Sequence, residues 1–156
     1  MTAAAPLVKN RRLARVLALD VLYQAEIRDQ LPVDALSSLR REGWSVTIGA
    51  QDPAPAPNEE AVAYASELVE GVQAHAAEID QLISRFAERW AIERMPVIDK
   101  NLVRIASFEL LWGRDVPTAV AINEAVELAK SMSTDESARF VNGILGRVAL
   151  EASSGG

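Results

Sequence analysis

Four basic side chains lie close together near the start of the chain, in the segment KNRRLAR. They are Lys9, Arg11, Arg12 and Arg15. A guanidinium group can donate two parallel hydrogen bonds to a phosphate and can stack on a ring. The chain carries a formal net charge of −6, and all 22 of its acidic residues follow residue 19. Basic charge gathered at one end of an acidic chain indicates binding to nucleic acid or another anionic surface; a solvated helix face that binds nothing charged is the alternative.

The residue types that usually perform catalysis or bind metals are few. His75 is the only histidine, and the chain has no cysteine. No Glu-x-x-His motif accompanies His75, so we expect a surface or partly packed histidine and not a metal ligand. Most carboxylates fall in the first turns of expected helices or opposite basic side chains, and the serines near residue 133 have no histidine base beside them. We therefore predict no enzymatic activity, no cofactor and no metal site.

The length and composition set the broad class of protein. A chain of 156 residues suits one domain, or two small subdomains that share a core. The absence of cysteine fits a reducing compartment. We find neither a secretory signal nor an apolar stretch long enough to cross a membrane, so we expect a cytoplasmic protein without a membrane segment.

Helical periodicity runs through almost the whole chain. A first helix is predicted from Asn10 to about Arg28, where Leu13 and Leu17 share one face and the three arginines lie nearly opposite. Leu13 stands between the arginines, and we expect its side chain to point inward. Further helices are predicted over residues 32–41, 58–90 with a break near 71–76, 97–113, 118–133 and 136–152. The fold class is therefore all-α, with about seven helices and no sheet.

Capping and proline signals mark the helix boundaries. Asn58 is a predicted N-cap, and Ser133 with Glu136 forms a predicted capping box before the last helix. Gly143 and Gly146 lie in helical phase within that helix, where we expect them to allow close helix packing. The remaining boundary residues are Pro32, Pro96, Gly113 and Pro117.

One stretch breaks the helical pattern. Residues 43–57 contain DPAPAP, which favours extended backbone, and they predict a long loop after the first two helices. We treat residues 1–156 as one domain with an N-terminal helical part, about 8–76, and a C-terminal helical part, about 77–151.

Several segments together point to a known family. IDKNLVRIASFEL, DVPTAVAINEAVELAKSMSTDESARFVNGILGRV and the N-terminal RRLAR...VLY resemble the NusB family of bacterial transcription antitermination factors. The resemblance covers most of the chain, with only the loop at 43–57 outside it, and it implies an all-helical, NusB-like fold. The chain is also similar to the N-terminal domain of some ribosomal RNA cytosine methyltransferases, but 156 residues leave no room for a methyltransferase domain, and we expect a binding factor.

The resemblance implies a function in transcription. A member of the family would bind the boxA element of ribosomal RNA transcripts together with a small-subunit ribosomal protein, NusE, in a complex with RNA polymerase and other Nus factors. The resemblance would place the following residues at the RNA: Lys9, Arg11, Arg12, Arg15, Phe86, Arg89, Asp135, Glu136, Ser137, Arg139 and Phe140. It would place Tyr23, Asp99, Arg104 and Glu109 at the ribosomal protein.

The sequence leaves three alternatives open. Phe86 and Phe140 either stack on bases or pack in the core. The basic face could instead recognise an acidic protein, which would make the chain a non-catalytic protein-interaction module. The chain could also form a homodimer that covers the arginine face.

Overall fold

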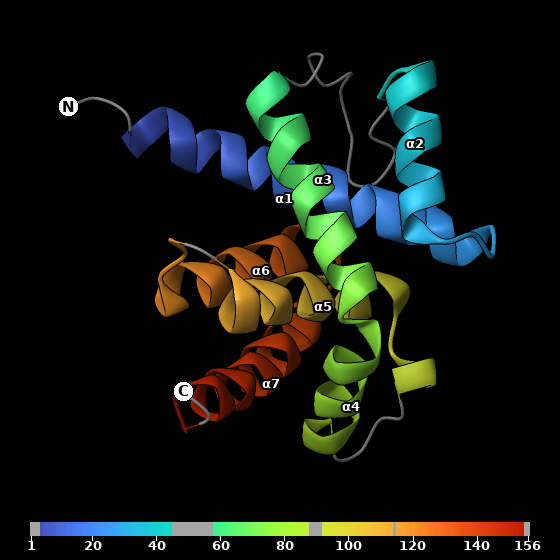
Figure 1. Cartoon of the computed structure of the whole chain (residues 1–156). Helices are drawn as coiled ribbons and strands as arrows, with labels where there is room; N and C mark the ends of the chain where they lie inside the picture. Colours follow the sequence, from blue (N-terminus) through green and yellow to red (C-terminus); the bar gives the residue numbers. More distant parts are fainter. Residues whose placement is uncertain (1–3, 45–57, 88–91, 114, 155–156) are drawn as a thin grey trace. The chain divides into compact units, whose positions relative to one another are not determined.

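The computed structural model describes residues 4–44, 58–87, 92–113 and 115–154 (Figure 1). Within these ranges the backbone forms seven α-helices and one short 3-10 turn, and no strand. The helices are α1 (Ala4–Ile27), α2 (Pro32–Glu42), α3 (Glu59–Ala74), α4 (Ala76–Phe86), α5 (Val97–Trp112), α6 (Thr118–Met132) and α7 (Asp135–Ser154), and the turn is η1 (Ile92–Arg94). This confirms the all-α prediction.

The chain packs as two units. The first spans Met1–Gln73, with α1, α2 and most of α3, and the second spans Ala74–Gly156, with α4 to α7. The predicted break in the long helical stretch is confirmed, because α3 ends at Ala74 and α4 begins at Ala76.

In the first unit, polar side chains cap the starts of α2 and α3. Pro32 occupies the first turn of α2, as predicted. The next backbone N–H, that of Val33, donates to the Gln73 side-chain oxygen of α3 at 2.9 Å. Asn58 is the N-cap of α3, as predicted, because its Oδ1 accepts from the Ala61 N–H at 2.8 Å. Asn58 also donates to Asn10 of α1 at 2.8 Å, which ties α3 to α1.

In the second unit, α5 packs against both α6 and α7, and α4 packs against α5 and α7 (Figure 1). Apolar side chains from each helix fill the space between them. The fully buried large ones are Ile79, Ile83, Leu102, Val103, Leu145, Val141 and Val148. This core fixes which face of α7 remains at the surface.

Two predictions about α7 are wrong. Its N-cap is Thr134 and not Ser133, because the Ser137 N–H donates to Thr134 Oγ1 at 2.9 Å. The capping interaction therefore joins Thr134 to Ser137, one residue later than the predicted pair. Gly143 and Gly146 are not sites of close helix packing, because a Cβ added at either would meet no atom within 4 Å.

The predicted loop at 43–57 lies mostly outside the described residues. The part that is described fits the prediction, because α2 ends at Glu42 and residues 43–44 are not helical. None of the helices in the described ranges is both long and apolar enough to span a lipid bilayer.

Candidate nucleic-acid interface

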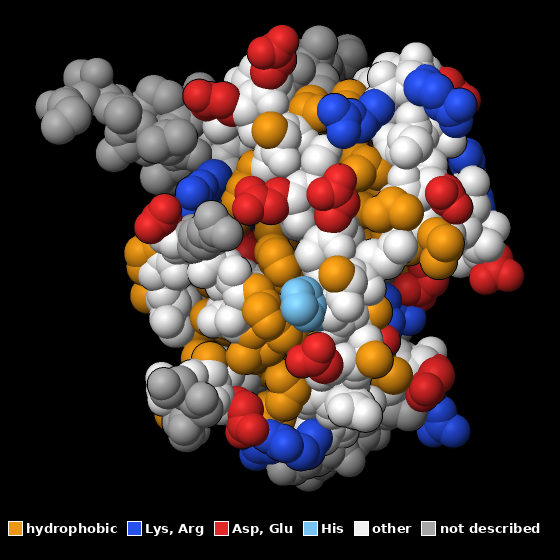
Figure 2. Space-filling model, in the orientation of Figure 1, with side chains coloured by type: hydrophobic (Ala, Val, Ile, Leu, Met, Phe, Trp, Pro, Cys, Tyr) orange, Lys and Arg blue, Asp and Glu red, His pale blue; other side chains and the backbone are white. Residues whose placement is uncertain are grey.

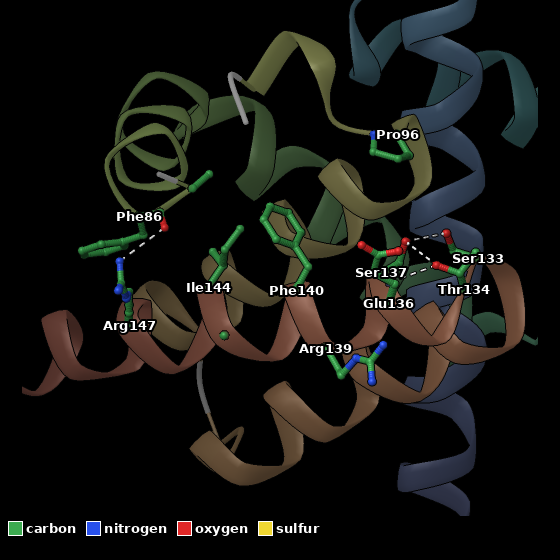
Figure 3. Close-up of a pocket in the computed structure, with 12 residues that line it drawn as sticks. Phe86, Pro96, Ser133, Thr134, Glu136, Ser137, Arg139, Phe140, Ile144 and Arg147 are labelled. Carbon is green, nitrogen blue, oxygen red and sulfur yellow. Dashed lines mark hydrogen bonds between the residues drawn. The ribbon is translucent and has the colours of Figure 1, made fainter. Parts of the chain in front are cut away.

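A groove of about 680 Å³ opens along α7 in the second unit (Figure 3). Five residues that the NusB resemblance assigns to RNA binding line it: Phe86, Glu136, Ser137, Arg139 and Phe140. The other lining residues were not predicted: Ala87, Pro96, Ser133, Thr134, Gly143, Ile144 and Arg147. The structure thus joins the end of α4 to one side of α7, although these segments lie about 50 residues apart in the sequence.

Helical spacing explains the long wall of the groove. Phe140, Ile144 and Arg147 follow one another at intervals of four and three residues, so they lie on one face of α7. Figure 3 shows Phe140 and Ile144 projecting from the same side of the helix. Phe140 is half-buried and Ile144 is buried, so the wall is apolar but still reached by solvent. The same spacing, applied to the sequence, would have found Ile144 and Arg147.

At one end of the groove, hydroxyl groups gather around the start of α7. The Oγ of Ser133 and the Oγ1 of Thr134 donate to Ser137 Oγ at 3.1 and 3.0 Å. The exposed Glu136 carboxylate lies beside them, in the first turn of α7, where the helix dipole favours a negative charge. This end therefore offers acceptors to N–H groups of a ligand.

At the other end, arginines surround Phe86. The Arg85 guanidinium lies 4.8 Å from the centroid of the Phe86 ring, and Arg147 Nη1 lies 3.5 Å from the Phe86 carbonyl oxygen. An ion pair of 2.8 Å between Arg85 and Glu151 further joins α4 to α7. Phe86 is half-buried, so neither it nor Phe140 belongs wholly to the core.

Arg139 lies at the border of the groove with a second hollow. In Figure 3 its guanidinium projects from the side of α7 opposite to Phe140. The second hollow lies between α6 and α7, measures about 630 Å³, and is also lined by Asp135, Lys130 and Asn142. The exposed Arg139 and Asp135 thus face a different hollow from the one that holds the aromatic rings, although Arg139 reaches both.

In the first unit, the predicted arginine face of α1 is only partly exposed. Arg15 is 3% exposed, and its guanidinium lies 6.0 Å from the centroid of the Tyr64 ring of α3. The guanidinium of Arg11, one turn earlier, lies 4.9 Å from the same ring, and this side chain is half-buried. Arg12 is exposed, whereas Leu13 is half-buried and not fully inward as expected.

Part of the covering of Arg15 comes from α3. Arg11 and Arg15 share a helix face, and α3 lies on that face with Tyr64 available for cation–π contact. The amphipathic pattern of α1 could not show this, because it does not reveal which side α3 covers. Lys9 and Arg89, the two remaining predicted cations, have side chains outside the described residues.

Comparison with known proteins shows what kind of chain this is. The family model described as "NusB family" matches residues 12–150. The chain is 48% identical over 139 residues to the transcription antitermination protein NusB of Salinispora arenicola, which covers 89% of this chain and 94% of that protein. The chain belongs to the NusB family. Its relatives are named for transcription antitermination and not for a catalysed reaction.

Solved structures of NusB proteins share the fold. The structure of T. maritima NusB is 35% identical, covers 90% of this chain and 91% of its own, and superposes with a TM-score of 0.75. A crystal structure of the antitermination factors NusB and NusE in complex with dsRNA contains a chain that is 24% identical, with a TM-score of 0.74, coverage of 92% of this chain and 98% of that one. The first supports the family assignment, and the second shows the fold.

The NusB resemblance assigns four residues to a partner protein, and these residues differ in how far they are exposed. Tyr23 of α1 is half-buried. Arg104 of α5 makes a forked pair with Asp80 of α4, at 2.9 and 3.0 Å, and is partly exposed. Asp99 and Glu109 of α5 are buried, at 0% and 2% exposure. Among the described residues, neither carboxylate oxygen of Asp99 has a hydrogen-bond partner.

The single histidine is partly packed, as predicted. The His75 ring stacks on Trp112 with 3.8 Å between centroids, and Phe108 lies further along the same face of α5. Figure 2 shows the histidine among hydrophobic side chains. Within the described ranges, no group of three or more His, Cys, Asp or Glu side chains is placed to hold a metal ion.

Proposed function

We propose that this chain is a transcription antitermination factor that binds a boxA-type element of ribosomal RNA transcripts together with the ribosomal protein NusE. It would act in the cytoplasm, within a complex that contains RNA polymerase and other Nus factors. Membership of the NusB family supports the general role, and the solved complex of NusB and NusE with dsRNA supports RNA and NusE as ligands.

The groove along α7 carries the proposal for this chain. It combines two partly exposed phenylalanines with hydroxyl and carboxylate acceptors and with arginines. Single-stranded RNA offers unstacked bases that stack on aromatic rings and N–H groups that such acceptors bind. Stacking contributes on the order of 1–3 kcal/mol per base. The groove therefore suits a single-stranded segment better than a regular duplex, whose bases are already stacked.

Gly143 offers a direct test of the groove. Its missing side chain leaves the groove open, and nothing within 4 Å would oppose a Cβ there. Gly143→Gln should fill the groove without disturbing the core and should weaken binding of a fluorescently labelled boxA-type RNA by about tenfold or more, which corresponds to the loss of one stacked base. Fluorescence anisotropy would measure the affinity, and thermal melting would establish that the variant folds.

Gly146→Gln is the matched control. Gly146 lies one turn away in the same helix and also has nothing within 4 Å of its Cβ position, but it does not line the groove. Equal affinities for the Gly143 and Gly146 variants would contradict the proposed RNA site. If the wild-type chain instead retains an acidic protein and no RNA in a pull-down, the protein-interaction alternative is supported.

The NusE surface remains a proposal built on Tyr23, Asp99, Arg104 and Glu109. Because Asp99 and Glu109 are buried, we propose that they support the α5 surface from within the second unit, and that Arg104 of this unit and Tyr23 of the first unit each touch the partner. Tyr23→Ala should weaken capture of purified NusE, with Arg28→Ala, an exposed change just after the end of the same helix, as its control. Unchanged capture by the Tyr23 variant would remove this residue from the surface.

The purified NusE also allows a test of whether NusE and RNA strengthen each other's binding. We propose that the acidic chain alone binds RNA weakly and that NusE adds contact surface to the same RNA. RNA affinity should then rise when NusE is present. Light scattering, with and without RNA, would show whether a homodimer exists and whether RNA dissociates it.

A further inference from the structure

The groove is long enough for more than one nucleotide. Its lining residues on α7 run from Glu136 to Arg147. At a rise of about 1.5 Å per residue, this stretch of helix is about 16 Å long. A stacked nucleic-acid strand advances about 3.4 Å per nucleotide, so one base at Phe140 would leave most of this length unused.

The charge differs between the two ends of the groove. The end near the start of α7 carries Glu136 and three hydroxyl groups, and its carboxylate repels a phosphate. Arg139 also borders the groove, but its guanidinium projects from the side of α7 opposite to Phe140 (Figure 3), where it lines the second hollow as well. A phosphate within the groove is therefore favoured at the opposite end.

Arg147 is the cation that lines that opposite end. Its side chain is exposed, and one of its nitrogens lies 3.5 Å from the carbonyl oxygen of Phe86. This contact holds the guanidinium at the end of α4, and a guanidinium can donate to several acceptors at once. The acid one turn further along α7, Glu151, pairs with Arg85 at 2.8 Å.

We propose that Arg147 binds a backbone phosphate of the RNA while a neighbouring base lies at Phe140. The N–H groups of the bound segment would then face Glu136 and the hydroxyl groups at the start of α7. This inference rests on the proposed function, because it assigns a further contact to the same groove. It also places the phosphate contact toward the C-terminal end of the groove and the base contacts toward the start of α7.

Salt dependence distinguishes a phosphate contact from a packing contact. Each phosphate contact to a single strand contributes about −0.7 to the slope of log affinity against log salt concentration. Arg147→Gln should weaken binding of the labelled boxA-type RNA by roughly 3- to 10-fold and should make the slope shallower by about 0.7. Arg147→Lys keeps a cation at this position and should retain the slope. Arg41→Gln, which removes an exposed arginine from α2, should change neither quantity.

The outcomes separate this inference from the proposed function. If Gly143→Gln weakens binding but Arg147→Gln changes neither affinity nor slope, Arg147 does not bind phosphate and the RNA site stands. If Arg147→Gln weakens binding with an unchanged slope, the side chain acts through packing and the inference is overturned. If the wild-type chain retains no RNA, with or without NusE, the proposed function itself fails.

Discussion

At the scale of single residues, three glycines in helices or at their ends should respond differently to the same substitution. Gly143→Ala and Gly146→Ala place a methyl group in open space within α7, so each should raise the free energy of unfolding by about 0.5–1 kcal/mol. Gly113→Ala should lower it, because a Cβ there would overlap the Glu109 carbonyl oxygen. Urea unfolding measures all three values. If Gly143→Ala or Gly146→Ala lowers the free energy of unfolding, that glycine does serve close helix packing, as the sequence predicts.

The start of α7 provides a second comparison between neighbouring residues. Thr134 caps the helix through the Ser137 N–H, whereas Ser133 reaches only the Ser137 hydroxyl. Thr134→Ala should therefore cost about 1 kcal/mol of the free energy of unfolding, and Ser133→Ala should cost less than half of that. If urea unfolding shows a larger loss for Ser133→Ala than for Thr134→Ala, Ser133 is the N-cap.

At the scale of secondary-structure elements, a forked pair joins α4 to α5. Both nitrogens of the fork in Arg104 meet the carboxylate of Asp80, and a third nitrogen donates to Asn101 at 3.0 Å. Because both partners are partly exposed, we expect a coupling free energy of about 1 kcal/mol between them. A double-mutant cycle of Asp80→Ala and Arg104→Ala, followed by urea unfolding, measures it.

The same cycle separates structure from recognition at Arg104. If Arg104 only holds α5 against α4, Asp80→Ala should impair NusE capture as much as Arg104→Ala does. If Arg104 touches NusE, its variant should impair capture more than the Asp80 variant at equal stability. A coupling near zero would show that the fork does not stabilise the packing of α4 on α5.

Elements were predicted from sequence better than the surfaces they form. Local chemistry determines helix ends, so Asn58, Pro96 and Pro117 marked boundaries that the structure confirms. Burial depends on which helix covers which face, so the sequence could not show that α3 would cover Arg15. The groove was only partly predicted for the same reason. Helical spacing places Arg147 on the same face as Phe140, but it does not show that α4 lies beside α7 and closes a groove there.

At the scale of the whole molecule, the predicted RNA contacts fall in two separate units. Arg12 is an exposed cation of the first unit, and the groove with Gly143 belongs to the second. If one RNA molecule contacts both units at once, Arg12→Ala and Gly143→Gln should each weaken binding of the same boxA-type RNA. Their effects on the binding free energy should then add, because distant and independent contacts contribute separately.

The two variants should also differ in a second measurement. Arg12→Ala removes a phosphate contact and should make the salt slope shallower by about 0.7, whereas Gly143→Gln blocks stacking and should leave the slope unchanged. Anisotropy titrations of the wild-type chain, both single variants and the double variant, at several salt concentrations, supply every value. Loss of binding in only one single variant would confine the RNA to that unit. A double variant no weaker than either single variant would mean that the two sites do not contribute independently to one complex.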